Sequence, residues 1–170
     1  IKKIASVTFN EQRMAPTRGR IIDDINQLLE DKKLVDCSDF LNIRNEPKIV
    51  KLLDDSNDNT NSYEMFSDNV FVKEGTKKLK RILFITCVYI YILDVENFKV
   101  QKTFERKLLT KFTISKKNCN LIAFHYQSGN DLVIEILRRL ELLYFFRDLY
   151  KLRNFGKLAF KYSDEFSIKK

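Results

Sequence analysis

The chain has 170 residues, of which 44% are hydrophobic and 32% are charged, and its net charge is +8. This composition is that of a globular domain and excludes a disordered chain, while four glycines leave little scope for a glycine-rich phosphate loop. The positive charge is uneven: residues 1–60 carry 10 Lys and Arg against 11 Asp and Glu, whereas residues 61–170 carry 21 against 12. A basic region of this kind favours a polyanionic partner, such as anionic lipid, nucleic acid or an acidic protein surface.

Metal-binding and membrane-spanning roles find no support in the sequence. Cys37, Cys87 and Cys119 are far apart and lack metal-ligand spacing, so we expect buried, reduced thiols in a cytosolic protein. The single histidine, His125, is expected to be structural, because no nucleophile or acid beside it is evident. The longest apolar run, residues 82–93, is too short to cross a bilayer. We therefore predict no catalytic residue, no metal and no cofactor.

Two helices are predicted in the first part of the chain. Apolar residues recur at helical spacing over residues 21–33, with acidic residues in the first turn, where they suit the helix dipole. A second, short helix is predicted over residues 38–43, with Ser38 as its N-cap and its end before Pro47. We expect residues 1–60 to form an N-terminal extension with helices.

Strands are predicted from residue 63 onward, because apolar and polar residues alternate and turn residues separate the runs. A turn at residues 74–76 joins two of these strands, and residues 128–130, Ser-Gly-Asn, predict a hairpin. The predicted strands are residues 70–73, 82–86, 89–94, 100–104, 111–115, 121–126, 131–135, 158–162 and 166–168.

The strongest helix is predicted over residues 137–150, where apolar residues recur at i, i+3 and i+4 spacing. Its aromatic residues 144–146 are expected in the core, whereas Arg138 and Arg139 are expected to reach outward to solvent. Antiparallel strands covered by one long amphipathic helix are typical of the pleckstrin-homology layout, because a bent sheet needs a cover over its open end. The predicted fold class is α+β: a pleckstrin-homology-like bent antiparallel sheet or barrel over residues 61–170, capped by this helix.

Several segments also have a distinctive order along the chain. Residues 80–86 read KRILFIT and are followed by YIYILD at residues 89–94, by ISKKN at 114–118, by NLIAFH at 120–125 and by DLVIE at 131–135. Upstream lie DFLNI at residues 39–43, NEPK at 45–48 and FSD at 66–68. In order and spacing, these segments resemble the tail-homology-one domain of class I myosins, with its R-LLLT…YLLD hairpin and its ISVS…DGLFVLH and GDLLLES segments.

The resemblance covers roughly residues 38–170, and it implies a non-catalytic tail domain that binds inositol phospholipids or anionic membranes and links them to the cytoskeleton. The lipid site of that family uses a lysine on the first strand and an arginine that opens the second. Arg81 matches the arginine position. The lysine position falls on Val72, with Lys73 one residue away.

A run of five cations on the predicted hairpin is the candidate anion- or lipid-binding site: Lys73, Lys77, Lys78, Lys80 and Arg81. Phosphate binding needs several cations converging on one place, and five within nine residues could supply them. The alternative is a solvated strand edge whose charges block aggregation. Seven more cations could widen the same face or could be ordinary solvent-facing residues: Lys99, Lys102, Arg106, Lys107, Lys111, Lys116 and Lys117.

The predicted partner is therefore an anionic phospholipid such as a phosphoinositide, or an acidic protein surface, with a possible cytoskeletal partner. The expected location is cytoplasmic, at the cytoskeleton or the membrane periphery. The alternative function is a structural protein–protein module of a cytoskeletal or axonemal (ciliary) assembly that has lost the lipid site, and the departure at Val72 favours it. Nucleic acid is not expected, because no aromatic platform for bases is evident.

Overall fold

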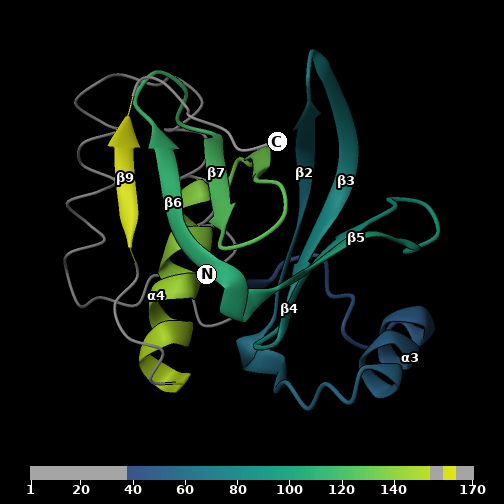
Figure 1. The fold of residues 1–170 in the computed structure, drawn as a ribbon. Helices are drawn as coiled ribbons and strands as arrows, with labels where there is room; N and C mark the ends of the chain where they lie inside the picture. Colours follow the sequence, from purple (N-terminus) through teal and green to yellow (C-terminus); the bar gives the residue numbers. More distant parts are fainter. Residues whose placement is uncertain (1–37, 154–158, 164–170) are drawn as a thin grey trace, which may run out of the picture.

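The computed structural model describes residues 38–153 and 159–163 (Figure 1). The helix predicted over residues 21–33, the strand predicted over 166–168 and Cys37 lie outside the described residues. The helices are α3 (Pro47–Asp55) and α4 (Arg139–Arg153), and two short 3-10 helices span Ser62–Glu64 and Arg106–Leu108. The strands are β1 (Ser38–Asp39), β2 (Phe66–Glu74), β3 (Lys77–Ile85), β4 (Tyr89–Leu93), β5 (Val100–Glu105), β6 (Leu109–Ser115), β7 (Leu121–Tyr126), β8 (Leu132–Glu135) and β9 (Phe160–Ser163).

The nine strands of the described ranges belong to one sheet, in the order β5-β4-β3-β2-β8-β7-β6-β9, with β1 paired in parallel beside β2. The sheet is curled. Phe104 of β5 stacks on Tyr126 of β7 at 4.6 Å between ring centroids, and this contact is possible only if the sheet bends, since four strands separate β5 from β7 in the sheet order. The predicted barrel is nevertheless wrong, since the sheet does not close. The side of β6 that could have received β5 is taken by β9, which pairs with β6 in parallel.

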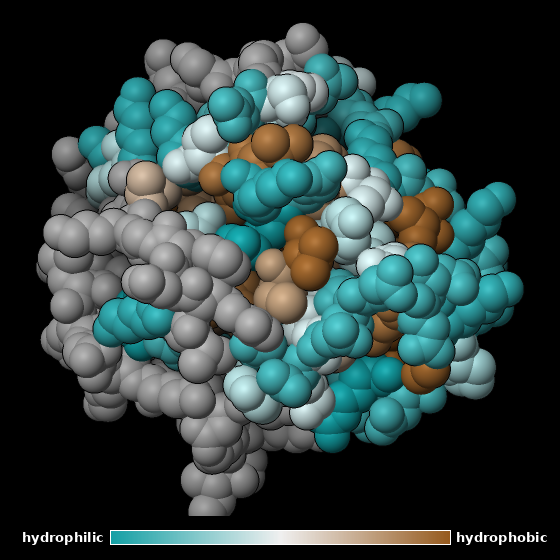
Figure 2. Space-filling model, turned by 60° about the horizontal axis from the view of Figure 1, so that its bottom comes forward, coloured by the Kyte–Doolittle hydropathy of each residue, from teal (hydrophilic) through white to brown (hydrophobic). Residues whose placement is uncertain are grey.

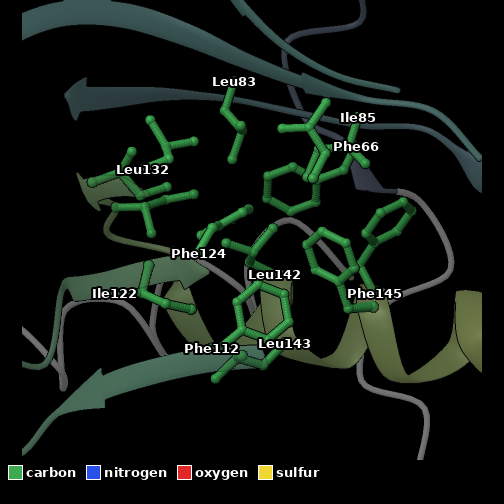
Figure 3. Packing of buried hydrophobic residues seen from close by; sticks show 14 of the residues in the cluster. Phe66, Leu83, Ile85, Phe112, Ile122, Phe124, Leu132, Leu142, Leu143 and Phe145 are labelled. Atoms are coloured by element: carbon green, nitrogen blue, oxygen red, sulfur yellow. The ribbon is translucent and has the colours of Figure 1, made fainter. Parts of the chain in front are cut away.

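The main core lies between the curled sheet and α4 (Figure 3). Side chains from β2, β3, β6 and β7 converge there on α4, among them Phe66, Leu83, Phe112 and Phe124. The helix predicted over residues 137–150 is confirmed with shifted ends. Its aromatic residues 144–146 are buried, as expected. The long helix thus covers one end of the sheet by burying its apolar and aromatic side chains.

A second core lies on the opposite face of β3 and β4, where α3 covers the sheet. Ile49 of α3 packs with Phe84 of β3 and Tyr91 of β4, and the rings of Phe84 and Tyr91 stack at 6.0 Å. Both faces of β3 are therefore buried over Ile82–Ile85. The boundary predicted at residue 60 stays a prediction, although α3 packs directly on the sheet.

The helix predicted over residues 38–43 is wrong. Ser38–Asp39 instead form strand β1, and the Asp39 carboxylate accepts hydrogen bonds from the backbone N–H groups of Ile43 (3.3 Å) and Arg44 (3.1 Å). The helix starts later, at Pro47, because the first turn of a helix needs no N–H from that residue and proline already has a helical φ. Pro47 therefore begins a helix here, although the sequence pattern predicted that a helix ends before it.

Two arginines at the start of α4 connect the helix to the sheet, so their predicted outward orientation is wrong. Arg138 Nη1 donates to both carboxylate oxygens of Asp68, at 3.0 and 3.1 Å, and its guanidinium lies over the ring of Phe40. Arg139 is fully buried and donates to the carbonyls of Ser115, Asn118 and Leu121 at 2.9–3.1 Å. Arg139 is thus buried among carbonyl acceptors, whereas the half-buried Arg138 neutralises the buried Asp68 carboxylate.

The face turned forward in Figure 2 is mixed in character where it is formed by described residues. When the bottom of Figure 1 is brought forward, hydrophobic residues appear as small separate areas among hydrophilic ones (Figure 2). Within the described ranges, no helix is long and apolar enough to cross a bilayer.

Candidate anion-binding site

The five predicted site residues lie on a two-stranded projection of the β2–β3 hairpin. Strand β8 pairs with β2 only at Phe71 and Val72, and β4 pairs with β3 only over residues 82–85. Residues 73–81 extend beyond these pairings, and we call them the arm. Its turn is made at Gly75, where φ is +60°, a conformation that favours glycine. Figure 1 shows the tip of the arm projecting at the top of the view.

The arm presents its five cations on two opposite faces. The β2–β3 register is regular and pairs Lys73 with Lys78 and Val70 with Arg81. Because strand side chains alternate, Lys73, Lys78 and Lys80 share the face of Phe84, whereas Lys77 and Arg81 share the face of Leu83. The structure therefore brings the cations together along one hairpin but does not converge them on one point.

Ion pairs also distinguish Lys78 from the other four cations of the arm. Lys78 Nζ lies 3.1 Å from the Glu135 carboxylate, and Lys102 of β5 neutralises Glu74 at 2.8 Å. Four arm cations form no ion pair with any carboxylate in the described ranges: Lys73, Lys77, Lys80 and Arg81. Arg81 uses one N–H on the carbonyl of Lys80, at 2.8 Å. The arm therefore keeps four positive charges that no described carboxylate neutralises, with Lys77 and Lys80 exposed and Lys73 and Arg81 half-buried.

Two carboxylates near the arm, Glu74 and Asp94, have lowered pKa values. A hydrogen bond from Lys102, followed by its charge and smaller contributions from Arg81 and Lys77, lowers the pKa of Glu74. Two backbone N–H groups, from Glu96 and Asn97, and to a lesser degree Arg81, lower the pKa of Asp94. The electrostatic character of the arm is therefore fixed over the neutral and mildly acidic range.

The lysine position of the resembling family is not available for a ligand. Val72 occupies it, is buried in the main core and pairs with Leu79. The neighbouring Lys73 lies on the face opposite Arg81. A pocket formed by one lysine and one arginine at these positions is therefore not built in this chain.

The other basic residues widen the site little. Arg106 is buried, donates Nε to the Cys87 carbonyl at 2.7 Å and lies over the ring of Tyr150. Lys107 pairs with Glu105 at 3.0 Å, and Lys116 lies over the ring of Tyr162. Lys99, Lys111 and Lys117 are exposed on other turns and strands.

The sequence did not reveal a network of three hydrogen-bonded side chains: Thr113, His125 and Asp131. His125 Nε2 lies 2.6 Å from the Thr113 hydroxyl, and Nδ1 lies 2.8 Å from the Asp131 carboxylate. The β7–β8 hairpin pairs Phe124 with Leu132, so its register already places Asp131 opposite His125. Thr113 and His125 are buried, and this hydrogen-bond network connects β6, β7 and the β7–β8 turn.

The described cysteines and acidic residues form no metal site. Cys87 is half-buried and Cys119 is buried, and both are free thiols. Within residues 38–153 and 159–163, no group of His, Cys, Asp and Glu is arranged to hold a metal ion.

The fold and the arm define the class of the protein: a β-rich domain whose curled sheet carries a projecting basic hairpin. Residues 37–170 match the family model described as "unconventional myosin tail, actin- and lipid-binding". The chain belongs to this family of myosin tails, which confirms the resemblance found in the sequence. The curled sheet is consistent with a pleckstrin-homology-like fold.

Among solved structures, the chain is similar to the hSac2 domain from the human phosphoinositide phosphatase Sac2. The two share 12% identity with a TM-score of 0.42, over 75% of this chain and 94% of that one. No curated protein matches the chain.

Proposed function

We propose that this domain docks on anionic phospholipid surfaces through the arm and links those surfaces to the cytoskeleton. The observation that carries the proposal is the set of four unpaired cations on a projecting hairpin in a family described as actin- and lipid-binding. Its location would then be cytoplasmic, at the membrane periphery or the cytoskeleton.

The two-faced arrangement favours binding to a charged surface over binding to one headgroup. A stereospecific phosphate pocket needs donors aimed at one point, and Lys73 and Arg81 lie on opposite faces of the arm. A planar anionic bilayer can contact the tip of the arm edge-on, where both faces reach lipid headgroups. Each lysine or arginine near such a surface contributes about 1 kcal/mol, and salt screens the attraction. Phosphoinositides would then bind through their charge, as would phosphatidylserine.

Vesicle flotation tests this proposal. Wild-type protein is expected to float with phosphatidylcholine vesicles that contain phosphatidylserine or a phosphoinositide at equal total charge, and not with phosphatidylcholine alone. The triple variant Lys77→Gln, Lys80→Gln, Arg81→Gln should lose about 3 kcal/mol, or roughly 100-fold in affinity. The matched control Lys99→Gln, Lys111→Gln, Lys117→Gln removes the same net charge from other exposed sites and should change binding little. Equal loss in both triple variants would show that only net charge matters.

A second candidate function is a structural protein–protein module of a cytoskeletal or axonemal assembly. The observation that favours it is the burial of Val72 at the family's lysine position. Co-sedimentation with actin filaments and with microtubules distinguishes the two. Filament binding together with absent vesicle binding would favour this second candidate.

A further inference from the structure

A groove of about 510 Å³ lies where strands β2 and β8 separate. Strand β1 pairs with β2 at residues 66–67, and β8 pairs with it at 71–72. Between these pairings, residues 68–70 have β3 as their only strand partner among the described strands. The groove opens beside this gap, and its lining includes Phe71, Lys80, Arg81, Val95, Glu135 and Leu137.

The groove concentrates exposed apolar side chains. The described residues include six large hydrophobic side chains that are exposed, and three of these line the groove: Phe71 at 40%, Val95 at 40% and Leu137 at 46%. They come from β2, from the β4–β5 turn and from the segment between β8 and α4. Exposed apolar residues are ordinary when scattered, but three gathered in one concavity indicate a binding surface.

Leu137 is held outward by its two neighbours. The Ile136 side chain lies in the main core, and its N–H donates to the Asn120 carbonyl at 2.8 Å. On the other side, Arg138 is fixed to Asp68 by two hydrogen bonds. Because both flanking residues are anchored, Leu137 cannot turn into the core without breaking one of these connections. The apolar surface of the groove is therefore built into the fold.

The charged residues that line the groove are positive overall. Lys80 and Arg81 line it without an ion pair to any described carboxylate, whereas its one acidic residue, Glu135, is neutralised by Lys78. An apolar concavity beside two unpaired cations suits a ligand that carries both apolar and acidic groups. Because the apolar residues line a hollow, they fit an inserted side chain better than a flat bilayer surface.

We propose that this groove binds a peptide segment of a protein partner, with an aromatic or aliphatic side chain inserted beside Phe71, Val95 and Leu137 and carboxylates facing Lys80 and Arg81. The site is separate from the tip of the arm, apart from the two shared cations. The proposal stands on the apolar groove, and membrane docking by the arm is not required for it.

A random dodecapeptide library displayed on phage tests the proposal, with the full chain as the target. Selected sequences should combine Phe, Leu or Ile with Asp or Glu, and synthetic copies labelled with fluorescein should bind measurably by anisotropy. The groove variant Val95→Thr, Leu137→Gln should weaken that binding at least tenfold. The matched control Val50→Thr, Val88→Thr alters two side chains that are both 41% exposed elsewhere, and it should bind within twofold of wild type.

Charge reversal gives a second, independent readout. Lys80→Glu should weaken the selected peptides strongly, whereas Lys111→Glu, on β6, should not. The proposal is overturned if no acidic–apolar sequence is enriched or if selected peptides bind the groove variant as well as wild type. It is also overturned if the groove variant loses vesicle flotation or self-association while peptide binding is unchanged, because the occupant would then be a membrane or a second copy of the chain. Failure of wild-type flotation alone would count only against membrane docking.

Discussion

The two halves of strand β3 have opposite environments. Ile82–Ile85 is buried on both faces, between the main core and the core under α3. Lys77–Arg81 continues the same strand, paired with the same neighbour in unbroken register, yet its cations on both faces lie at the surface. One strand thus carries a segment that stabilises the fold and a segment available for binding.

This difference separates the part of the strand that stabilises the fold from the part that we propose binds a partner. The buried half is covered by α3 on one side and by α4 and β6–β8 on the other, so changes there alter packing. The arm extends past β4 and β8, so its side chains can change with little effect on the core. Substitutions in the buried half should therefore lower stability strongly without a specific effect on binding. Substitutions in the arm should weaken binding with little effect on stability.

The largest expected effect comes from truncating the buried half. Phe84→Ala removes a fully buried ring that stacks on Tyr91, and it should lower the free energy of unfolding by about 4 kcal/mol. Lys80→Ala, on the same face of the same strand, should change it by less than about 0.5 kcal/mol. Denaturant unfolding of both variants measures the contrast. Similar losses in both would mean that the arm contributes to the core.

A smaller loss is expected where the buried part of β2 meets α4. Arg138→Met removes the partner of Asp68, which is buried, and should cost about 2–3 kcal/mol at neutral pH. Burial already raises the pKa of Asp68, and the Arg138 charge opposes that rise. Without Arg138, the folded-state pKa rises further, so the ionised carboxylate is penalised more.

The sign of the pH dependence follows from that shift. An acid whose pKa is raised by folding costs stability above that pKa, and the cost is relieved as pH falls through it. The deficit of Arg138→Met should therefore shrink on acidification, measured as the difference in unfolding free energy from wild type between pH 7 and pH 4.5. The double variant with Asp68→Asn should lose this pH dependence. A deficit independent of pH would assign the loss to packing over Phe40 instead.

Much of the fold could be predicted from the sequence, because alternation and helical spacing report burial directly. The strands at residues 121–126 and the long helix come from such patterns. The end of the sheet could not be predicted, because whether β9 or β5 pairs with β6 depends on long-range geometry that periodicity does not contain. Pro47 was misread, since a proline is compatible both with the end of one helix and with the start of the next.

The candidate site was predictable in composition but not in geometry. The cations of the arm are visible in the sequence, yet their division between two faces requires the register of β2 with β3. The groove was invisible, because Phe71, Val95 and Leu137 come from three separate parts of the chain. Arg138 and Arg139 were placed in solvent because their acceptors, Asp68 and three turn carbonyls, are distant in sequence.

The buried half should also lose stability at alkaline pH, through Tyr91. Burial raises the pKa of Tyr91, which packs on Phe84, so above pH 10 the unfolded chain loses this proton first. Stability is fully retained below that pH and then falls by at most about 1.4 kcal/mol per pH unit from this group. Tyr91→Phe should reduce the alkaline loss, whereas Tyr63→Phe, at a side chain that is 61% exposed, should not. Urea midpoints at pH 8–11 measure it, and an identical alkaline loss in both variants would contradict the assignment.

The smallest expected effect is that of mildly acidic pH on vesicle binding by the arm. Glu74 and Asp94 have lowered pKa values, so both stay ionised below the range of ordinary carboxyl groups, and the chain's one histidine lies on β7. Flotation with phosphatidylserine vesicles should therefore change less than about twofold between pH 7.5 and 5.5, since no arm charge titrates there. Glu74→His supplies a positive control, because it places a titrating group on the arm and should tighten binding at pH 5.5. Tightening of the wild-type protein over the same range would mean that a group outside the arm contributes to the membrane contact.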